Sequence, residues 1–211
     1  AFVGLAPFNK LSHMDVAVLN ILAPFAQSHV NILYGTGQYE IMPKGFPLLP
    51  LARTFCAFPT RAICSFLGDM FSNLGSKYIN ESRIPVYLCH LPAGTSLKNL
   101  VHFMQLLDSK KATKFDYGPD DNLIYYGQEE PPQYKISNVK TDVGIFWSRG
   151  DQFVPPANVR ELIKDLGPRV KKNFFIDDPY YTHVHFAVAL NNPEVLYKDL
   201  FEFMDKYASS S

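Results

Sequence analysis

Asp151 and His183 could form a catalytic pair, judged by their residue types and their positions along the chain. Asp151 follows the apolar run 143–147, which predicts a short strand ending at a turn, and His183 lies in a loop after a second predicted strand over 170–176. Functional groups of open α/β sheets sit just beyond the carboxyl ends of strands, so we expect the two residues on neighbouring loops. A histidine oriented by a carboxylate is the general-base half of a nucleophilic triad.

The nucleophile that such a pair would activate is missing from the sequence. α/β-Hydrolases carry their triad in the order Ser, Asp or Glu, His, and Asp151 and His183 would supply the last two members. No G-x-S-x-G sequence, the strand–turn–helix nucleophile site of that fold, occurs in the 211 residues. The backbone donors of the oxyanion hole surround that serine and come from an earlier loop, so we expect them to be missing as well.

Less specific explanations exist for the same residues. An aspartate at a strand end is often only a turn residue. His183 and His185 would present two imidazoles on one face of an extended segment near Asp177 and Asp178, which is a conceivable metal site. No third ligand has a suitable spacing, so we expect no metal and no cofactor. The remaining histidines are expected to be structural or surface groups: His13, His29, His90 and His102.

Composition excludes several classes of protein. Lys and Arg total 20 and Asp and Glu total 20, and this neutral balance argues against a nucleic-acid partner. A hydrophobic fraction of 47% with 19% charged residues argues against disorder. No apolar run reaches the roughly 18–20 residues that span a bilayer, and no signal-peptide pattern is visible. Three cysteines without a C-x-x-C pair argue against a zinc site or a disulfide scaffold.

The order of the elements predicts an α/β fold. Residues 2–7 are typical of a buried strand, and Val143 to Ile176 gives strand, helix and strand, which favours a parallel sheet. Between them, residues 10–135 carry helical patterns separated by Pro and Gly. Four helices are expected from apolar faces: Met14 to Phe25; Leu97, Leu100, Val101, Met104 and Leu107, capped by Thr95 or Ser96; Pro156 to Leu166; and, after Asn192-Pro193, Leu196, Leu200, Phe203, Met204 and Tyr207.

Five segments, in order along the chain, resemble signature segments of the acid lipases, the gastric and lysosomal α/β-hydrolases of neutral lipids. Residues 2–7 resemble the "ALAP" strand of that family, and residues 87–96 (YLCHLPAGTS) resemble its "SHxPAGTS" segment. Residues 128–134 (QEEPPQY) resemble "QxxPPxY", residues 147–151 resemble "WxGGxD", and residues 181–186 resemble "YxHxDF".

The resemblance implies the C-terminal half of an α/β-hydrolase fold with a mainly helical cap or lid. Residues 1–9 would be a core strand, residues 10–135 the cap over an acyl-binding crevice, and residues 136–211 the C-terminal core. Asp151 would be the triad acid and His183 the triad base. The N-terminal sheet, the oxyanion loop and the GHSxG serine of the family would precede Ala1.

Further features are implied by the family alone. Cys56 and Cys64 lie close to its cap disulfide, Asn80 in Asn80-Glu81-Ser82 matches a glycosylation sequon, and the compartment would be secretory or lysosomal. Two departures concern the site: Arg149 stands where a small residue is usual, and His185 stands where the family has Asp. The loss of that Asp leaves open how the loop of His183 is held.

The predicted activity is hydrolysis of carboxylic esters of neutral lipids, such as triacylglycerol or cholesteryl ester, at a lipid–water interface. We expect the chain alone to be inactive and to need a complementing N-terminal segment. The alternative is a non-catalytic lipid-binding fragment or pseudoenzyme that keeps the apolar crevice. An upstream GHSxG sequence would favour the first hypothesis, and its absence would favour the second.

Overall fold

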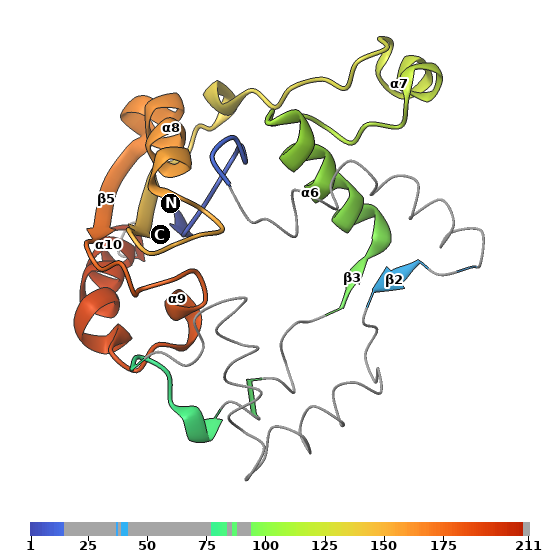
Figure 1. Ribbon diagram of the computed structural model, residues 1–211. Coiled ribbons are helices and arrows are strands. Elements are labelled where there is room, and N and C mark those ends of the chain that lie inside the picture. Colours follow the sequence, from blue (N-terminus) through green and yellow to red (C-terminus); the bar gives the residue numbers. More distant parts are fainter. Residues whose placement is uncertain (15–36, 38, 42–76, 84–85, 88–93, 209–211) are drawn as a thin grey trace.

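The structure is a computed structural model that describes residues 1–14, 37, 39–41, 77–83, 86–87 and 94–208 (Figure 1). The helix expected from Met14 to Phe25 falls largely outside these residues. All three cysteines, Cys56, Cys64 and Cys89, also lie outside them.

Three parallel strands form the sheet, in the order β1 (Phe2–Leu5), β4 (Val143–Ser148) and β5 (Val170–Ile176). β1 pairs with β4 from Phe2 opposite Val143 to Leu5 opposite Phe146, and β4 pairs with β5 up to Ser148 opposite Ile176. Strands far apart in sequence are therefore neighbours, and the predicted parallel sheet is confirmed. β4 lies in the middle, and its carboxyl end meets that of β5.

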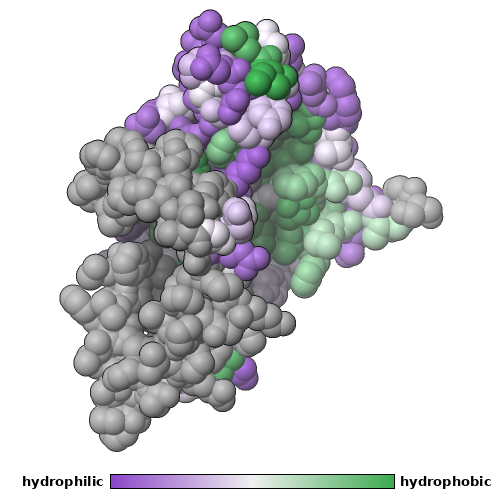
Figure 2. All heavy atoms as spheres, turned by 90° about the vertical axis from the view of Figure 1, so that its right-hand side faces the viewer, coloured by the Kyte–Doolittle hydropathy of each residue, from purple (hydrophilic) through white to green (hydrophobic). Residues whose placement is uncertain are grey.

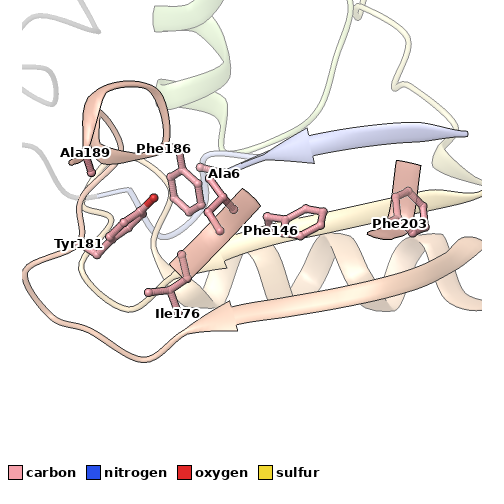
Figure 3. Packing of buried hydrophobic residues seen from close by; sticks show 8 residues of the cluster. Ala6, Phe146, Ile176, Tyr181, Phe186, Ala189 and Phe203 are labelled. Atoms are coloured by element: carbon pink, nitrogen blue, oxygen red, sulfur yellow. The ribbon is translucent and has the colours of Figure 1, made fainter. Parts of the chain in front are cut away.

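Helices cover both faces of β4. Its side chains alternate between the two faces, and every residue of the strand is therefore buried. Val143, Ile145 and Trp147 pack with buried residues of α8 (Pro156–Leu166). On the other face, Phe146 joins Phe203 of α10 (Lys198–Ala208) and the segment after β5 (Figure 3). The Phe203 ring lies so close to Gly144 that a Cβ there would be 2.7 Å from it.

β1 lies at the edge of the sheet and is less buried than the sequence predicts. Phe2 is 54% exposed and Leu5 is 39% exposed, whereas only Gly4 is buried within the strand. Within the described residues β1 has a hydrogen-bonded neighbour on one side alone. The prediction of a strand is confirmed, and the prediction that it is buried is wrong for these two residues.

The chain after β5 differs from the predicted loop and single helix in two respects. A short helix, α9 (His185–Val188), begins where a loop was expected to end. The last helix starts as the π-helix η5 (Pro193–Tyr197) and continues as α10. Leu196 and Phe203 are buried as predicted, but Met204 is 48% exposed, because the apolar stripe of α10 is narrower than the periodicity indicates.

The region 10–135 contributes α6 (Leu97–Ser109) and α7 (Pro119–Tyr126). Ser96 caps α6 as predicted, since its side chain accepts a hydrogen bond from the Asn99 N–H at 3.1 Å. Shorter elements of this region are β2 (Glu40–Ile41), which pairs antiparallel with β3 (Thr95–Ser96), and the 3₁₀ turn η2 (Glu81–Arg83). Two more 3₁₀ turns, η3 (Ile136–Asn138) and η4 (Gly167–Arg169), precede β4 and β5.

Apolar side chains of α7 lie exposed at the surface. Figure 2 shows a small hydrophobic area among hydrophilic residues at the top of the molecule, the end at which α7 lies in Figure 1. Leu123 and Ile124 of α7 are exposed. None of the helices within the described ranges combines the length and the apolarity needed to cross a membrane.

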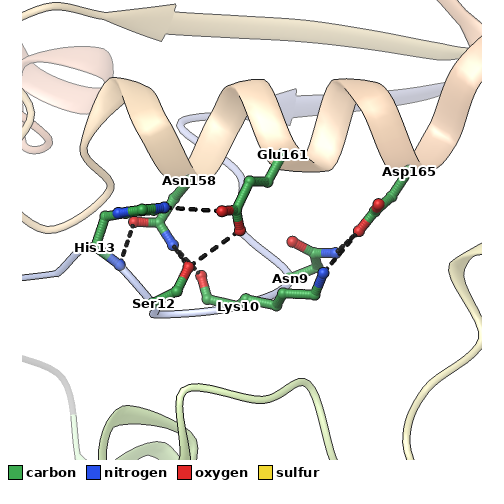
Figure 4. Close-up of polar contacts among 7 residues, drawn as sticks. All are labelled: Asn9, Lys10, Ser12, His13, Asn158, Glu161 and Asp165. Atoms are coloured by element: carbon green, nitrogen blue, oxygen red, sulfur yellow. Dashed lines mark hydrogen bonds and ion pairs between the residues drawn. The ribbon is translucent and has the colours of Figure 1, made fainter.

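A polar seam fastens residues 9–14 to α8 (Figure 4). The buried Asn158 amide donates to the Lys10 carbonyl at 2.6 Å and accepts from the His13 N–H at 3.2 Å. Ser12 and His13 reach Glu161 at 3.1 and 2.8 Å. Leu11 and Met14, from the same segment, pack with buried residues of α6. The seam therefore connects β1, α8 and α6.

Candidate active site

Asp151 and His183 meet at the carboxyl ends of β4 and β5. Asp151 belongs to the acid loop, residues 149–155 between β4 and α8, and His183 belongs to the histidine loop, residues 177–184 between β5 and α9. The imidazole Nδ1 lies 2.8 Å from Asp151 Oδ2. The Asp151 side chain is 1% exposed and the His183 side chain is 40% exposed. A buried carboxylate thus faces a partly accessible imidazole.

Both carboxylate oxygens of Asp151 have partners, which fixes its orientation. Oδ1 accepts a hydrogen bond from the Val154 N–H at 2.8 Å, while Oδ2 faces His183. A carboxylate can only accept, so Nδ1 of His183 carries the proton and donates it. In the neutral imidazole Nε2 then keeps its lone pair, as a general base requires.

The acid loop and the histidine loop touch backbone to backbone. A Cβ on Gly150 would lie 2.4 Å from the Pro179 carbonyl oxygen and 2.9 Å from that of Tyr181. The Ser148 hydroxyl donates to the Tyr181 carbonyl at 2.7 Å. The absence of a side chain at Gly150 therefore allows the approach that brings Asp151 to His183.

Arg149, one of the two departures from the family pattern, lies at the surface of this junction. Its N–H donates to the Ile176 carbonyl at 3.1 Å, and its Nε lies 3.2 Å from Asp177 Oδ1. Both side chains are exposed, so the ion pair contributes little to stability. Arg149 therefore takes part in the contact between the loops through its backbone, which any residue type provides.

Asp178 anchors the start of the histidine loop. It accepts hydrogen bonds from the Tyr78 hydroxyl and, at 2.8 Å, from the Tyr180 N–H. Burial alone would raise the pKa of Asp178, but these hydrogen bonds and the positive charges of Lys77 and Arg149 together lower the pKa below its usual range. Tyr78 thereby links the loop to the segment 77–83.

Tyr181 and Asn192 anchor the end of the histidine loop. The fully buried Tyr181 hydroxyl donates to Asn192 Oδ1 at 2.5 Å, and burial raises the pKa of Tyr181 well above its usual range. The Asn192 amide in turn donates to the His185 carbonyl at 2.9 Å. The phenol stays protonated and holds a structural hydrogen bond.

His185, the second departure, is the fully buried first residue of α9 and is hydrogen-bonded to Thr182 of the histidine loop. Its Nδ1 accepts the Thr182 N–H at 2.7 Å and lies 2.9 Å from the Thr182 hydroxyl oxygen. Burial lowers the pKa of the imidazole, and the nearby Asp178 carboxylate opposes this effect only in part. Sequence reasoning missed this role, although the spacing of Thr182 and His185, three residues apart, is the signal that could have indicated it.

A metal-binding role for His183 and His185 has no support in the geometry. His183 faces Asp151, and His185 Nδ1 is occupied by Thr182. The described part of the chain contains no group of three or more His, Cys, Asp or Glu residues that could hold a metal ion.

Phe153 of the acid loop gives the site an apolar side. Its ring centroid lies 5.8 Å from that of His183. It is partly buried and packs against both the apolar cluster of β4 with α8 and the cluster of residues 11–14 with α6. The imidazole is therefore next to the junction of the sheet and the region 10–135.

Other predicted site residues lie away from this pair or outside the described residues. Cys56 and Cys64 fall outside. Asn80 precedes η2, and its Oδ1 accepts from the Ser82 hydroxyl at 2.7 Å and the Ser82 N–H at 3.1 Å. The Nε2 atom of His102 lies 2.8 Å from the Thr113 carbonyl oxygen. His13 belongs to the polar seam.

Comparison with known proteins finds lipases as relatives. Lipase member K of Homo sapiens is 33% identical over 149 residues, 70% of this chain and 36% of the relative. Gastric triacylglycerol lipase of Homo sapiens is 28% identical over 201 residues, 94% of this chain and 49% of the relative. Lysosomal acid lipase/cholesteryl ester hydrolase of Rattus norvegicus is 30% identical over 175 residues, 81% of this chain and 43% of the relative. No protein-family model matches the chain.

The matches extend along most of the chain, but the chain spans only about half the length of the curated relatives, or less. The parallel sheet with flanking helices agrees with a partial α/β-hydrolase fold. By sequence, the chain is a homologue of the gastric and lysosomal acid lipases and of the related lipase family members.

Proposed function

We propose that this chain supplies the acid and the base of a serine hydrolase that cleaves carboxylic esters of neutral lipids. The observation that carries the proposal is the hydrogen bond between the buried Asp151 carboxylate and His183 Nδ1 at the carboxyl ends of two adjacent parallel strands. Homology to lipases supports the reaction class.

In this proposal His183 moves the proton and Asp151 holds His183 in place. Nε2 takes the proton of a serine hydroxyl as its oxygen forms a bond to the ester carbonyl carbon, and then gives that proton to the departing alcohol. A water molecule then attacks the acyl-enzyme in the same way: Nε2 takes a proton from the water and returns it to the serine oxygen as the carboxylic acid leaves. Asp151 keeps the proton on Nδ1 and stabilises the imidazolium that forms at each step.

The serine and the oxyanion donors come from outside these residues, since the 211-residue sequence has no G-x-S-x-G segment. We therefore also propose a complementing N-terminal segment. Residues 1–9 would be a core strand, residues 10–135 the cap, and residues 136–211 the C-terminal core. Residues 10–135 would form the cap at which the lipid–water interface meets the site. Their apolar, aromatic composition supports this assignment.

Substrate and compartment follow from the relatives. Their names include triacylglycerol lipase and cholesteryl ester hydrolase, so we propose one of these neutral esters as substrate and a secreted or lysosomal location. A glycan on Asn80 and a disulfide between Cys56 and Cys64 would suit that location.

The isolated chain tests the claim about the nucleophile. Purified chain with p-nitrophenyl butyrate should release nitrophenol no faster than buffer, and His183→Ala should change nothing. Turnover that His183→Ala abolishes and His13→Ala retains would show a nucleophile within the chain and overturn this part of the proposal.

A further inference from the structure

We propose that His185 is a positioning residue that holds His183 opposite Asp151, and that it does so only while its own imidazole is neutral. This deepens the proposed function in one respect, because it takes His183 as the base. The geometric claim itself concerns the histidine loop and stands independently of any hydrolase activity.

The contact that carries the proposal lies one peptide unit from His183. His185 Nδ1 accepts the Thr182 N–H at 2.7 Å, and the His185 N–H donates to the Thr182 carbonyl at 3.1 Å. Two hydrogen bonds thus close the turn over 182–185 around His183. The same i, i+3 spacing occurs in a capping box, where a Glu or Gln side chain accepts the earlier N–H. Here an imidazole nitrogen is the acceptor.

The His185 side chain is itself fixed, so it can serve as the reference for the turn. It is fully buried, with the Tyr78 ring edge-on at 5.7 Å and the Tyr181 ring at 5.5 Å between centroids. Its backbone carbonyl accepts from the Asn192 amide at 2.9 Å. Movement of this imidazole would require rearrangement of the two neighbouring aromatic rings.

Protonation would turn the acceptor into a donor. A proton on Nδ1 would face the Thr182 N–H and the Thr182 hydroxyl, which lies 2.9 Å away. The protein would then lose the hydrogen bond and bury a charge, both of which are costly. Because the bond sets the backbone before His183, we expect the protonated state to release His183 from Asp151.

The titratable neighbours in the described residues give the direction of the pH effect. Asp178 and Tyr181 face His185 from the histidine loop, and Tyr78 faces it from the segment 77–83. Burial lowers the His185 pKa below its ordinary value of 6.5, and Asp178 opposes this effect. A lowered folded-state pKa stabilises the fold above pH 6.5, and this contribution is lost as pH falls through the folded-state value. The pairing of His183 with Asp151 should weaken over the same acidic range.

The test reads the ring nitrogens of His183 directly. Magic-angle-spinning NMR of the sedimented full chain, labelled with ¹⁵N-histidine, distinguishes protonated from unprotonated ring nitrogens and does not depend on oligomeric state. His183→Asn assigns the His183 signals. The quantity followed against pH is the fraction of chains with His183 Nδ1–H hydrogen-bonded to a carboxylate.

Two substitutions of His185 distinguish the effect of its hydrogen-bond acceptor from the effect of its protonation. His185→Asn keeps a short acceptor but does not titrate, so it should hold the Nδ1–H signal of His183 to lower pH than the wild type. His185→Leu keeps apolar volume without an acceptor and should lose the signal at every pH. His13→Asn, a histidine of the polar seam, is the matched control and should follow the wild type.

The outcome that overturns the proposal is a His183 signal with the same pH dependence in wild type and His185→Asn. This comparison remains decisive if His185→Leu fails to fold. Ester turnover plays no part in these measurements, so failure of the hydrolase proposal would leave a positive result standing. Conversely, unchanged His183 signals would refute the role of His185 while leaving His183 available as a base.

Discussion

Asp151 and His183 face each other because the backbones of their two loops touch at Gly150. Strand ends in the sequence predict both residues at one edge of the sheet, and the structure places them there, 2.8 Å apart. The close contact between the loops is a further requirement that no pattern of residue types indicates. A side chain at Gly150 would collide with carbonyl oxygens, which cannot rotate away as a side chain can.

Gly150→Ala therefore should separate the loops. We expect a loss of about 1–3 kcal/mol in unfolding free energy, typical of overpacking against backbone, and a weaker contact between Asp151 and His183. Urea unfolding followed by tryptophan fluorescence measures the loss. Arg149→Ala is the matched control: it removes only an exposed ion pair and should change stability by less than about 1 kcal/mol. Equal effects of the two substitutions would contradict this explanation.

The role of His185 could not be predicted from its residue type. The resemblance to the family marked it as a departure that left the support of the histidine loop open. In the structure the same loop is held by an imidazole nitrogen, with Tyr78 and Asn192 as further anchors. The i, i+3 spacing of Thr182 and His185 could have indicated the turn, whereas the packing of Tyr78 against His185 joins segments about 100 residues apart, which spacing along the chain does not reveal.

At the scale of secondary structure, helices and strands with a clear hydrophobic periodicity were predictable. Features that depend on packing against other segments were not. β4, β5, α6 and α8 lie where their apolar patterns placed them. The exposure of Phe2 and Leu5 depends on which strands flank β1, and α9 forms where the loop turns over Thr182. Position 204 fits the helical period, but the stripe that α10 buries is too narrow to include it.

The polar seam between residues 9–14 and α8 gives a prediction at this scale. The hydrogen bond with His13 is the main reason that the pKa of Glu161 is lowered below its ordinary value of 4.5. A carboxylate with a lowered folded-state pKa stabilises the fold above pH 4.5 and loses that contribution as pH falls through the folded-state value.

Glu161→Gln should therefore lower the unfolding free energy near pH 7 by roughly 0.2–1 kcal/mol, since the pair is partly exposed. The difference from wild type should vanish in acid, once Glu161 is protonated in both states. Glu202→Gln, a change of the same charge at an exposed position on α10, should have no such pH-dependent effect. A difference in unfolding free energy between Glu161→Gln and wild type that stays constant across the pH range would show that the charge of Glu161 does not stabilise the seam.

For the whole molecule, the open edge of β1 is the main consequence of a three-stranded sheet. Among the described residues β1 is an apolar edge strand with exposed Phe2 and Leu5, and such an edge offers backbone groups to another chain. The predicted parallel sheet was correct, because strand–helix–strand patterns favour it. The strand order was not predictable, since β1 and β4 are joined by more than 130 residues.

We expect the isolated chain to form oligomers through this edge. Sedimentation velocity should show species larger than the monomer, and Leu5→Lys should shift the distribution towards the monomer by placing a charge at the edge. Leu190→Lys adds the same charge at an exposed position outside the edge and should leave the distribution unchanged. A monomeric wild type with a sharp two-state unfolding transition would refute this prediction.

The central claim is that Asp151 and His183 serve ester hydrolysis, and its most direct measurement is turnover by a protein that joins this chain to a serine nucleophile. In a fusion, the N-terminal segment of an acid lipase, with its G-x-S-x-G serine, would precede residue 1. We predict hydrolysis of p-nitrophenyl butyrate that falls by about 10³-fold or more in His183→Ala and in Asp151→Asn but persists in His13→Ala. A folded fusion whose turnover is unchanged by His183→Ala would contradict the account.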